Sequence, residues 1–396
     1  MIATVEGSYL KGTIPAIPSK SYAHRVAICN FLSNAPIAVC KDFSSNDIDV
    51  TVACLENIRR GVNDLDVGES GSTLRFLLPL CAALGGKYSF IGHGKLMQRP
   101  NDELFAVMRA HGIKVEQTDK IYIDGKLISG EYKIRGDISS QYISGLLMAL
   151  PFLCGDSEIV LTTPLCSAPY VEITLEVLKA FGIAIERTGN GFKVCGNQKY
   201  NGNSDVEGDW SNAAFFLVGA AINGEVTISG LNPDSVQGDK FILEILRLAG
   251  AAVDMDEKGV TVKKSEIKSF EFSAGNCPDL VPIAAVLAAF ANGKSVIKDV
   301  ERLKIKESDR IESTMAMLNG FGIKSESDGK SFIVYGGNPV CGKADSFNDH
   351  RLAMASSILA LGAQGVSTIT GANAVNKSYP TFYDDCQKLG GTVKYV

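Results

Sequence analysis

The stretch Pro18–Ser33, PSKSYAHRVAICNFLS, decides how the rest of the chain is interpreted. It opens with Lys20, Ser21 and Arg25 and continues into the almost uncharged run VAICNFL. An apolar run without a polar face is typical of a helix that is buried on all sides. The free N–H groups at a helix start attract anions, and cations there oppose the helix dipole. Lys20 and Arg25 therefore predict that something negative binds at the start of this helix.

The same order of a polar cluster and an apolar run occurs five more times. The clusters are GESGSTLR (68–75), GDISSQ (136–141), GDWSN (208–212), NCPD (276–279) and NDHR (348–351). Each apolar run ends at a turn signal and is followed by an alternating stretch, such as GEVTISGL or GVSTITGA, which predicts a strand. The sequence therefore predicts six buried helices, each preceded by a polar cluster.

A second set of predicted helices is amphipathic, and each of them ends at a glycine that caps the helix. The glycines are Gly61, Gly112, Gly182, Gly250, Gly322 and Gly391. After the shorter first member they recur roughly every 70 residues, and a fixed period indicates a repeated structural unit. We expect about six βαβαββ-like units, which could form one closed assembly or two groups of three. Chain crossings are expected near 15–18 and 205–209.

Composition limits the class of protein. The chain has 396 residues, 45% of them hydrophobic and 21% charged, which is typical of a soluble globular protein of two or three domains. We expect no signal peptide and no membrane span. The ten cysteines are scattered without a CxxC pair, and the four histidines lack metal-ligand spacing, which favours reduced thiols in the cytoplasm and no metal site. A net charge of −5 argues against nucleic-acid binding.

Taken in order, the polar motifs resemble those of the 5-enolpyruvylshikimate-3-phosphate synthase family. They are PSKSYAHR, GESGSTLR, MQRPND, GDISSQ, CSAPY, GDWSNAAFF, PDLVP, LKIKESDR, NDHRLAM and NKSYP. The resemblance implies an α/β fold, a two-domain inside-out α/β barrel of six βαβαββ-like repeats with three per domain. With the crossings above, it predicts a discontinuous domain of residues 1–18 and 207–396 and a continuous domain of residues 19–206. The active site would lie in the cleft between them.

The resemblance also implies a reaction. The enolpyruvyl group of phosphoenolpyruvate would be transferred to the 5-hydroxyl of shikimate 3-phosphate, with release of phosphate through a tetrahedral intermediate. This step belongs to the shikimate pathway of aromatic amino-acid biosynthesis. No metal or organic cofactor is implied. We expect a cytoplasmic monomer whose partners are these two small molecules, without nucleic acid or membrane.

Both implied substrates are polyanions, so fixed cations around them would stabilise developing charge. By the resemblance, the residues around phosphoenolpyruvate would be Lys20, Gly71, Arg99, Arg310, Arg351 and Lys377. The residues that hold shikimate 3-phosphate would be Ser21, Arg25, Ser139, Ser140, Gln141, Ser167, Tyr170 and Lys306. His350 would contact a ligand. The candidates for proton transfer are Asp279 at the attacking hydroxyl, and Glu307, Lys377 and Lys20 at the phosphoenolpyruvate side.

Two alternatives stay open. The first is a UDP-N-acetylglucosamine enolpyruvyl transferase, which would pair Lys with Asn where this chain has Lys20 and Ser21, and would carry a Cys before the Arg99–Pro100 pair. The second is a non-catalytic binder of phosphorylated metabolites, which would keep the arginines and lose the acid–base residues. Glu69 and Arg302 stand where members of the 5-enolpyruvylshikimate-3-phosphate synthase family often have Asn. Their effect on the site is left open.

Overall fold

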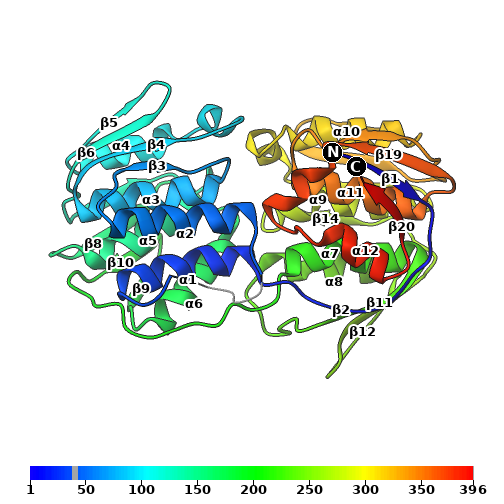
Figure 1. Ribbon diagram of the computed structural model, residues 1–396, viewed down its shortest axis with the longest axis horizontal. Coiled ribbons are helices and arrows are strands. Elements are labelled where there is room, and N and C mark those ends of the chain that lie inside the picture. Colours follow the sequence, from blue (N-terminus) through cyan, green and yellow to red (C-terminus); the bar gives the residue numbers. More distant parts are fainter. Residues whose placement is uncertain (38–42, 396) are drawn as a thin grey trace. The chain divides into compact units, whose positions relative to one another are not determined.

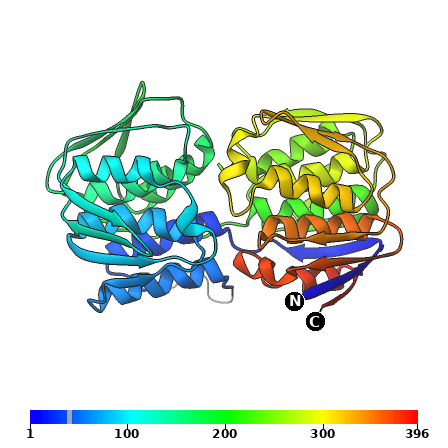
Figure 2. The same ribbon diagram turned by 90° about the horizontal axis from the view of Figure 1, so that it is seen from above.

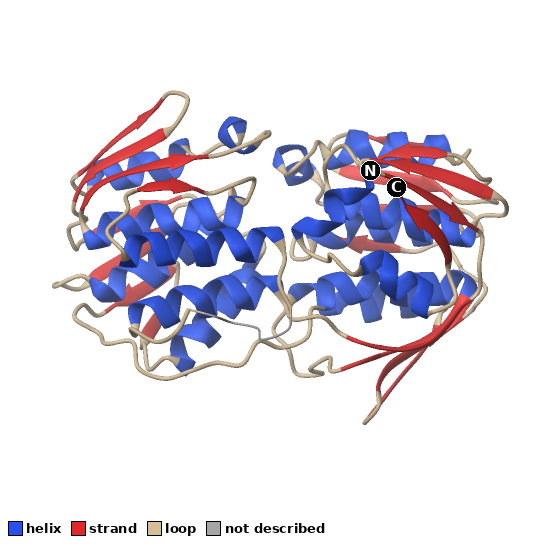
Figure 3. Cartoon of the chain, viewed as in Figure 1, coloured by secondary structure: helices blue, strands red, loops and turns tan. Residues whose placement is uncertain are grey.

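The computed structural model describes residues 1–37 and 43–395 of the chain. These residues divide into two compact units, of which unit 1 comprises Met1–Ser19 with Glu207–Val396 and unit 2 comprises Lys20–Val206 (Figure 1). The chain therefore leaves unit 1 after Ser19, one residue later than we expected, and returns at Glu207. Both units are mixtures of helices and sheets (Figure 3).

The described residues of unit 2 form two four-stranded sheets. The first has the order β3 (Asp64–Asp66), β4 (Gly86–Ile91), β6 (Ile121–Gly125) and β5 (Ile113–Gln117); the second has the order β7 (Glu131–Ile134), β8 (Ser157–Leu161), β10 (Gly191–Val194) and β9 (Ile185–Thr188). Its helices are α1 (Lys20–Leu32), α2 (Asn46–Arg59), α3 (Gly71–Leu84), α4 (Asp102–Ala110), α5 (Ser140–Ala149) and α6 (Ala168–Ala180). The 3-10 turns η1 (Leu96–Gln98) and η2 (Leu150–Phe152) complete the unit.

Unit 1 contains three four-stranded sheets. Their orders are β12 (Ala252–Asp256), β13 (Gly259–Lys263), β11 (Gly224–Ser229), β2 (Leu10–Pro15); β14 (Glu271–Ser273), β15 (Lys294–Lys298), β17 (Ser331–Tyr335), β16 (Ser325–Ser327); and β18 (Lys343–Asp345), β19 (Val366–Thr370), β1 (Ile2–Glu6), β20 (Thr392–Tyr395). The helices are α7 (Trp210–Asn223), α8 (Ile242–Leu248), α9 (Val281–Ala289), α10 (Arg310–Gly320), α11 (His350–Gly362) and α12 (Phe382–Lys388). The 3-10 turns are η3 (Gly238–Phe241), η4 (Pro278–Leu280), η5 (Glu301–Ile305) and η6 (Ala372–Lys377).

All five sheets share one topology. In each, an edge pair is parallel and the other two pairs are antiparallel, as β3, β4, β6 and β5 illustrate. A parallel pair needs a crossover connection, and here the crossover between β3 and β4 is the buried helix α3. The N-terminal strands β1 and β2 complete two sheets of unit 1, which explains why that unit is discontinuous.

The six apolar runs form helices where the sequence predicts them, namely α1, α3, α5, α7, α9 and α11. All nine residues of α9 are buried, because no side of this helix carries a polar residue. In unit 1, α7, α9 and α11 pack against one another, whereas in unit 2 α3 packs against α5 and α1 packs against α2 and α6 (Figures 2 and 3). The polar clusters therefore lie at the starts of buried helices.

The glycine caps have the left-handed backbone expected of a helix end, with φ of 78° at Gly61 and 92° at Gly112. The last cap is a correction, because α12 ends at Lys388 and the left-handed residue is Gly390 (φ 89°) and not Gly391. Among the described residues, three of the five sheets follow the order βαβαββ along the chain, and the other two are completed by β1 and β2. Of the sixth expected unit, which would contain α1 and α2, residues 38–42 lie outside the described part, and the described residues give it no sheet of its own.

Within residues 1–37 and 43–395, no helix has the length and apolarity that crossing a bilayer requires. Nine cysteines lie in this part of the chain, and all of them are free thiols.

Candidate active site

In unit 1, Arg310 occupies the centre of a network of carboxylates. It is the first residue of α10, and its side chain is 1% exposed. Its Nε donates to Oδ2 of Asp349 at 2.8 Å, its Nη1 to Oδ1 of Asp279 at 2.6 Å, and its Nη2 to Oε2 of Glu307 at 2.8 Å. These three carboxylates come from three different elements, and together they raise the already high pKa of Arg310 against the effect of burial. The guanidinium therefore stays charged and fixed in orientation.

Asp279, in η4, is shared by three cations. Besides Arg310, Nη2 of Arg351 donates to its Oδ2 at 3.2 Å, and Nζ of Lys306 lies 3.5 Å from its Oδ1. Burial favours the neutral acid, but Lys306, Arg351 and Arg310 outweigh it and hold the pKa of Asp279 well below its usual range. Burial in turn lowers the pKa of Lys306. Asp279 is thus ionised, with 19% of its side chain accessible to solvent.

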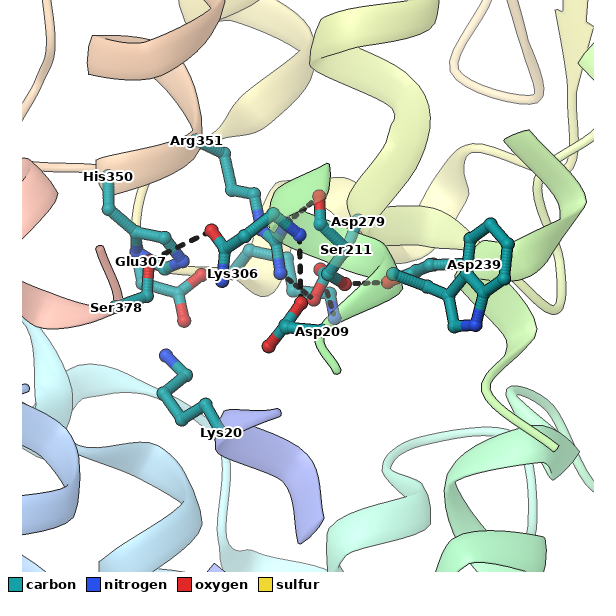
Figure 4. A network of polar contacts seen from close by, with 12 residues as sticks. Lys20, Asp209, Ser211, Asp239, Asp279, Lys306, Glu307, His350, Arg351 and Ser378 are labelled. Atoms are coloured by element: carbon teal, nitrogen blue, oxygen red, sulfur yellow. Dashed lines mark hydrogen bonds and ion pairs between the residues drawn. The ribbon is translucent and has the colours of Figure 1, made fainter. Parts of the chain in front are cut away.

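A further buried carboxylate, that of Asp239 in η3, is linked to Arg351 of this network through Ser211. Its Oδ2 accepts a hydrogen bond from Oγ of Ser211 at the start of α7. The carbonyl of the same serine accepts from Nη1 of Arg351 at 3.2 Å (Figure 4). Burial and the nearby charge of Asp279 raise the pKa of Asp239 to about 7. Two aspartates in one region therefore have pKa values that are shifted in opposite directions, a pattern typical of catalytic sites.

Two more predicted site residues, His350 and Lys377, lie at or contact the loop before α11. Asp349 caps the helix by accepting from the backbone N of Arg351 at 2.9 Å. His350, the first residue of the helix, is 3% exposed. Nζ of Lys377, at the end of η6, donates to the carbonyl of Asn348 at 2.6 Å. This bond holds Lys377 to the loop that contains Asp349, the partner of Arg310.

In unit 2, Arg25 connects α1 to α6. It is 3% exposed, and it donates to Oγ1 of Thr174 at 2.7 Å, to the carbonyl of Ser21 at 2.6 Å and to the carbonyl of Tyr170 at 2.8 Å. Burial lowers the pKa of Arg25 to about 10. The predicted residues Ser21, Arg25 and Tyr170 are therefore brought together, although Arg25 uses these donors on the protein itself.

Arg75, which the predicted set lacks, organises another group of predicted residues. Its Nη1 donates to Oε1 of Gln141 at 2.8 Å, and its Nη2 to the carbonyl of Pro100 at 3.0 Å. Gln141 donates in turn to Oγ of Ser72 at 2.9 Å. Arg75 thus holds a predicted ligand of shikimate 3-phosphate and the segment that follows Arg99. Its position in GESGSTLR was the signal that could have identified it.

Gly71 and Arg99 lie in direct contact. A Cβ on Gly71 would be 2.7 Å from Nη1 of Arg99, so the guanidinium occupies the space that any side chain at this position would need. Gly71 starts α3, whose N-cap Ser70 accepts from the backbone N of Thr73 at 3.2 Å. The glycine therefore allows Arg99 to approach the start of a buried helix.

The other predicted residues of unit 2 lie at the starts of α1, α5 and α6. Lys20, the first residue of α1, donates from Nζ to Oδ2 of Asp47 at 2.8 Å. Ser139 caps α5 and accepts from the backbone N of Gln141 at 3.3 Å, and Ser140 follows as the first helical residue. Ser167 precedes α6 with a left-handed φ of 54°. Asp47 is a further residue that the sequence did not predict.

Of the predicted set, Asp279, Lys306, Glu307, Arg310 and Arg351 form one connected network, and the other members lie at helix starts or in the loops described. Asp349, Asp239 and Asp47 are missing from the predicted set because their partners are distant in sequence, whereas Arg75 was missed although it lies in GESGSTLR. Among the described residues, no group of three or more His, Cys, Asp or Glu side chains could hold a metal ion.

Buried cations and carboxylates at the starts of apolar helices define an α/β enzyme whose substrates carry oxyanions. The family model described as EPSP synthase (3-phosphoshikimate 1-carboxyvinyltransferase) matches residues 60–386. The chain belongs to this family. The predicted family resemblance is therefore confirmed.

Curated relatives match the sequence of this chain over almost its full length. The 3-phosphoshikimate 1-carboxyvinyltransferase of Clostridium kluyveri is 37% identical and covers 98% of this chain and 97% of its own. The protein of the same name from Clostridium acetobutylicum is 39% identical, with 97% and 96% covered. Among solved structures, an EPSP synthase from Acinetobacter baumannii has a TM-score of 0.78 at 24% identity, with both chains fully covered. This likeness confirms the predicted α/β fold class.

Proposed function

We infer that the protein transfers the enolpyruvyl group of phosphoenolpyruvate to the 5-hydroxyl of shikimate 3-phosphate and releases phosphate. It acts as a 3-phosphoshikimate 1-carboxyvinyltransferase in the shikimate pathway. The observation that carries this function is the network of Asp279, Arg310, Arg351, Lys306 and Glu307 in a chain that belongs to the EPSP synthase family. The network combines fixed cations for oxyanions with carboxylates that can move protons.

The reaction has two steps. The 5-hydroxyl oxygen forms a bond to C2 of phosphoenolpyruvate and loses its proton, while C3 gains a proton and becomes a methyl group. The resulting tetrahedral intermediate loses a proton from that methyl group and breaks the bond to phosphate, which restores the double bond. Each step needs a base and an acid at fixed positions.

Asp279 is the base that we assign to the 5-hydroxyl. In the unliganded protein its low pKa makes it a weak base, because three cations surround it. A bound phosphate or carboxylate would share Lys306, Arg351 and Arg310 with Asp279 and would therefore raise the pKa of Asp279 toward that of a useful base. Substrate binding and activation of the base would thus be linked through the same cations.

Glu307 and Lys377 are assigned to proton transfer at C3, and Lys20 to the departing phosphate. Arg99, Arg310 and Arg351 suit the carboxylate and phosphate of phosphoenolpyruvate because a guanidinium can donate two parallel hydrogen bonds. The residues of this assignment come from both units. No metal or organic cofactor is required. We further propose that the enzyme acts as a monomer in the cytoplasm.

The experiment that tests the function follows phosphate release from purified protein with shikimate 3-phosphate and phosphoenolpyruvate. UDP-N-acetylglucosamine replaces shikimate 3-phosphate in a parallel reaction. Release with shikimate 3-phosphate alone is the expected result, and Asp279→Ala should abolish it. Release with the sugar nucleotide alone, or thermal stabilisation by the ligands without any release, would overturn the proposal in favour of the sister transferase or of a non-catalytic binder.

A further inference from the structure

Two short segments of unit 1 carry the chain out to unit 2 and back. Residues 17–19 precede the first crossing and residues 207–211 follow the second. The two segments run antiparallel, with a bridge between Pro18 and Gly208. The backbone N of Ser19 donates to the carbonyl of Glu207, and the backbone N of Asp209 donates to the carbonyl of Ile17, both at 2.8 Å. The exit and the return of the chain are therefore fixed next to each other.

A third segment, residues 235–239, binds the returning segment 207–211 through the side chain of every second residue. Ser235 and Gln237 both donate to Oε1 of Glu207, and Asp239 accepts from Ser211. Ser235, Gln237 and Asp239 are 4%, 6% and 3% exposed, so all three are buried polar groups. We call these three residues together with Glu207 the crossing clamp.

Gln237 is the part of the crossing clamp that reaches both crossings. Its Nε2 donates to Oε1 of Glu207 at 2.7 Å and to the carbonyl of Gly208 at 2.8 Å. Its Oε1 accepts from the backbone N of Trp210 at 3.2 Å and from Oγ of Ser19 at 3.3 Å. An amide has two N–H donors and two lone pairs, so this side chain makes every hydrogen bond that it can make.

Glu207 also accepts a hydrogen bond from a residue outside the crossing clamp. Its Oε2 accepts from Nδ2 of Asn232 at 2.8 Å, and the carbonyl of Asn232 accepts from Nε1 of Trp210 at 3.1 Å. A buried amide whose hydrogen bonds are all made, as those of Gln237 are, specifies one arrangement, because any shift leaves a buried group unpaired. The crossing clamp therefore defines where the chain leaves unit 1 and where it returns.

Predicted reactive groups adjoin the crossing clamp on both segments. Lys20 and Ser21 directly follow Ser19 in the chain. On the returning segment, the carbonyl of Ser211 accepts from Arg351, which binds Asp279. An error of about 1 Å in the position of a reacting group can cost roughly a hundredfold in rate, so the placement of these segments bears directly on turnover.

We propose that the crossing clamp, through Gln237, is a positioning device for the enolpyruvyl transfer inferred above, on which this proposal rests. It fixes the backbone before Lys20 and the start of α7 in one arrangement. Gln237 acts through Ser19 and Trp210 and is absent from the predicted substrate-binding set, so it is a positioning residue. A network that only stabilised unit 1 would affect folding without a selective effect on turnover.

The test compares Gln237→Glu and Ser19→Ala with wild type. Gln237→Glu keeps the shape of the side chain but removes its N–H donors and places a second carboxylate against Glu207. Ser19→Ala removes one hydroxyl with little loss of packing and serves where the first variant folds poorly. Ser295→Ala, which removes a buried hydroxyl in β15 that accepts from the backbone N of Phe270, is the matched control. Turnover, the Kd for shikimate 3-phosphate alone and its binding stoichiometry are measured for each.

We expect Gln237→Glu to lower kcat by about tenfold or more, with full stoichiometry and a Kd for shikimate 3-phosphate within about threefold of wild type. The Kd for shikimate 3-phosphate should stay near the wild-type value because most of the residues predicted to bind this substrate belong to unit 2. The double variant Glu207→Gln with Gln237→Glu should recover part of the turnover, since one carboxylate and one amide again face each other. Ser19→Ala should show a smaller fall, and Ser295→Ala none.

An unchanged kcat in both Gln237→Glu and Ser19→Ala would overturn the proposal, as would a parallel loss of kcat and binding stoichiometry, which would indicate a folding role. Failure of the wild-type protein to release phosphate would instead refute the proposed function, so the two failures are distinguishable. Hydrogen exchange of residues 17–21 and 207–211 gives a readout that is independent of activity. We expect faster exchange in Gln237→Glu than in Ser295→Ala, and equal rates would contradict the clamp.

Discussion

Arg310 and Asp349 form a fully buried ion pair, with Nε of the arginine 2.8 Å from Oδ2 of the aspartate and side-chain exposures of 1% and 0%. Removing one partner of such a pair leaves a buried charge without compensation, which costs about 3 to 5 kcal/mol. Because Arg310 keeps Asp279 and Glu307, we expect Asp349→Asn to lower the free energy of unfolding by about 3 kcal/mol.

Urea unfolding measures this change. The control is Asp124→Asn, which removes the partner of the exposed Lys87 at 3.7 Å and should cost less than about 1 kcal/mol. Equal changes in the two variants would show that burial does not strengthen the Arg310–Asp349 pair. The same loss of orientation should lower turnover in Asp349→Asn, because Arg310 belongs to the predicted site.

The raised pKa of Asp239 predicts a pH dependence of stability. In the unfolded chain an aspartate loses its proton near pH 3.8, whereas the folded protein keeps the proton on Asp239 until about pH 7. The folded state therefore binds more protons between these values, and stability falls as the pH rises from about 4 to 7. A difference of roughly three pKa units corresponds to about 4 kcal/mol.

Asp239→Asn cannot lose this proton, and its amide oxygen can still accept from Ser211. We expect the variant to be more stable than wild type at pH 8 by up to about 4 kcal/mol, and nearly equal to it at pH 4. Urea unfolding at both pH values, with the exposed Asp205→Asn as control, measures the effect. An equal difference between Asp239→Asn and wild type at the two pH values would contradict the raised pKa.

Gly71→Ala should weaken phosphoenolpyruvate binding selectively. The new methyl group would lie 2.7 Å from Nη1 of Arg99 and would force the guanidinium to move. A hydrogen bond to a charged group is worth about 1.5 to 3 kcal/mol, so we expect KM for phosphoenolpyruvate to rise roughly 10- to 100-fold. Steady-state kinetics with both substrates measures this change in KM.

The matched control for that substitution is Gly189→Ala, because no atom lies within 4 Å of a Cβ at this position. The Kd for shikimate 3-phosphate should stay near the wild-type value in both variants. A rise in that Kd together with KM would point to a displaced α3 and not to a displaced Arg99.

Glu307→Gln separates orientation from proton transfer. The amide oxygen can still accept the hydrogen bond that Arg310 Nη2 gives to Oε2 of Glu307 at 2.8 Å, but the amide cannot carry the proton. General acid–base catalysis contributes roughly 10²- to 10⁴-fold, so kcat should fall by that factor while the ligands still bind. Glu312→Gln, an exposed substitution on the same helix, should leave kcat unchanged. A fall of less than about tenfold in Glu307→Gln would limit Glu307 to orienting Arg310.

Local patterns predicted much of the fold. The apolar run of α9 and the glycine cap at Gly112 depend on residues that are near one another in sequence, and the structure has them as expected. The last cap was misplaced by one residue because Gly390 and Gly391 are adjacent and either can adopt a left-handed backbone. The sheet of the sixth unit stays a prediction.

Contacts between distant residues could not be predicted in this way. The partner of Arg310 is 39 residues away at Asp349, and Gln237 binds Ser19 across 218 residues. No periodicity records such pairs, because they depend on how helices pack after they form. The sequence predicted Arg310, Asp279 and Glu307, but not the distant partners Asp349 and Gln237.

The pairing of β1 has a consequence for how the chain is made. Glu6 in β1 lies opposite Val366 in β19 and Thr392 in β20, so this strand is synthesised long before either of its neighbours. Unit 2, by contrast, is encoded without interruption and can fold while synthesis continues. For most of translation β1 must therefore wait without its two partner strands, and the sheet that it completes can form only late in synthesis.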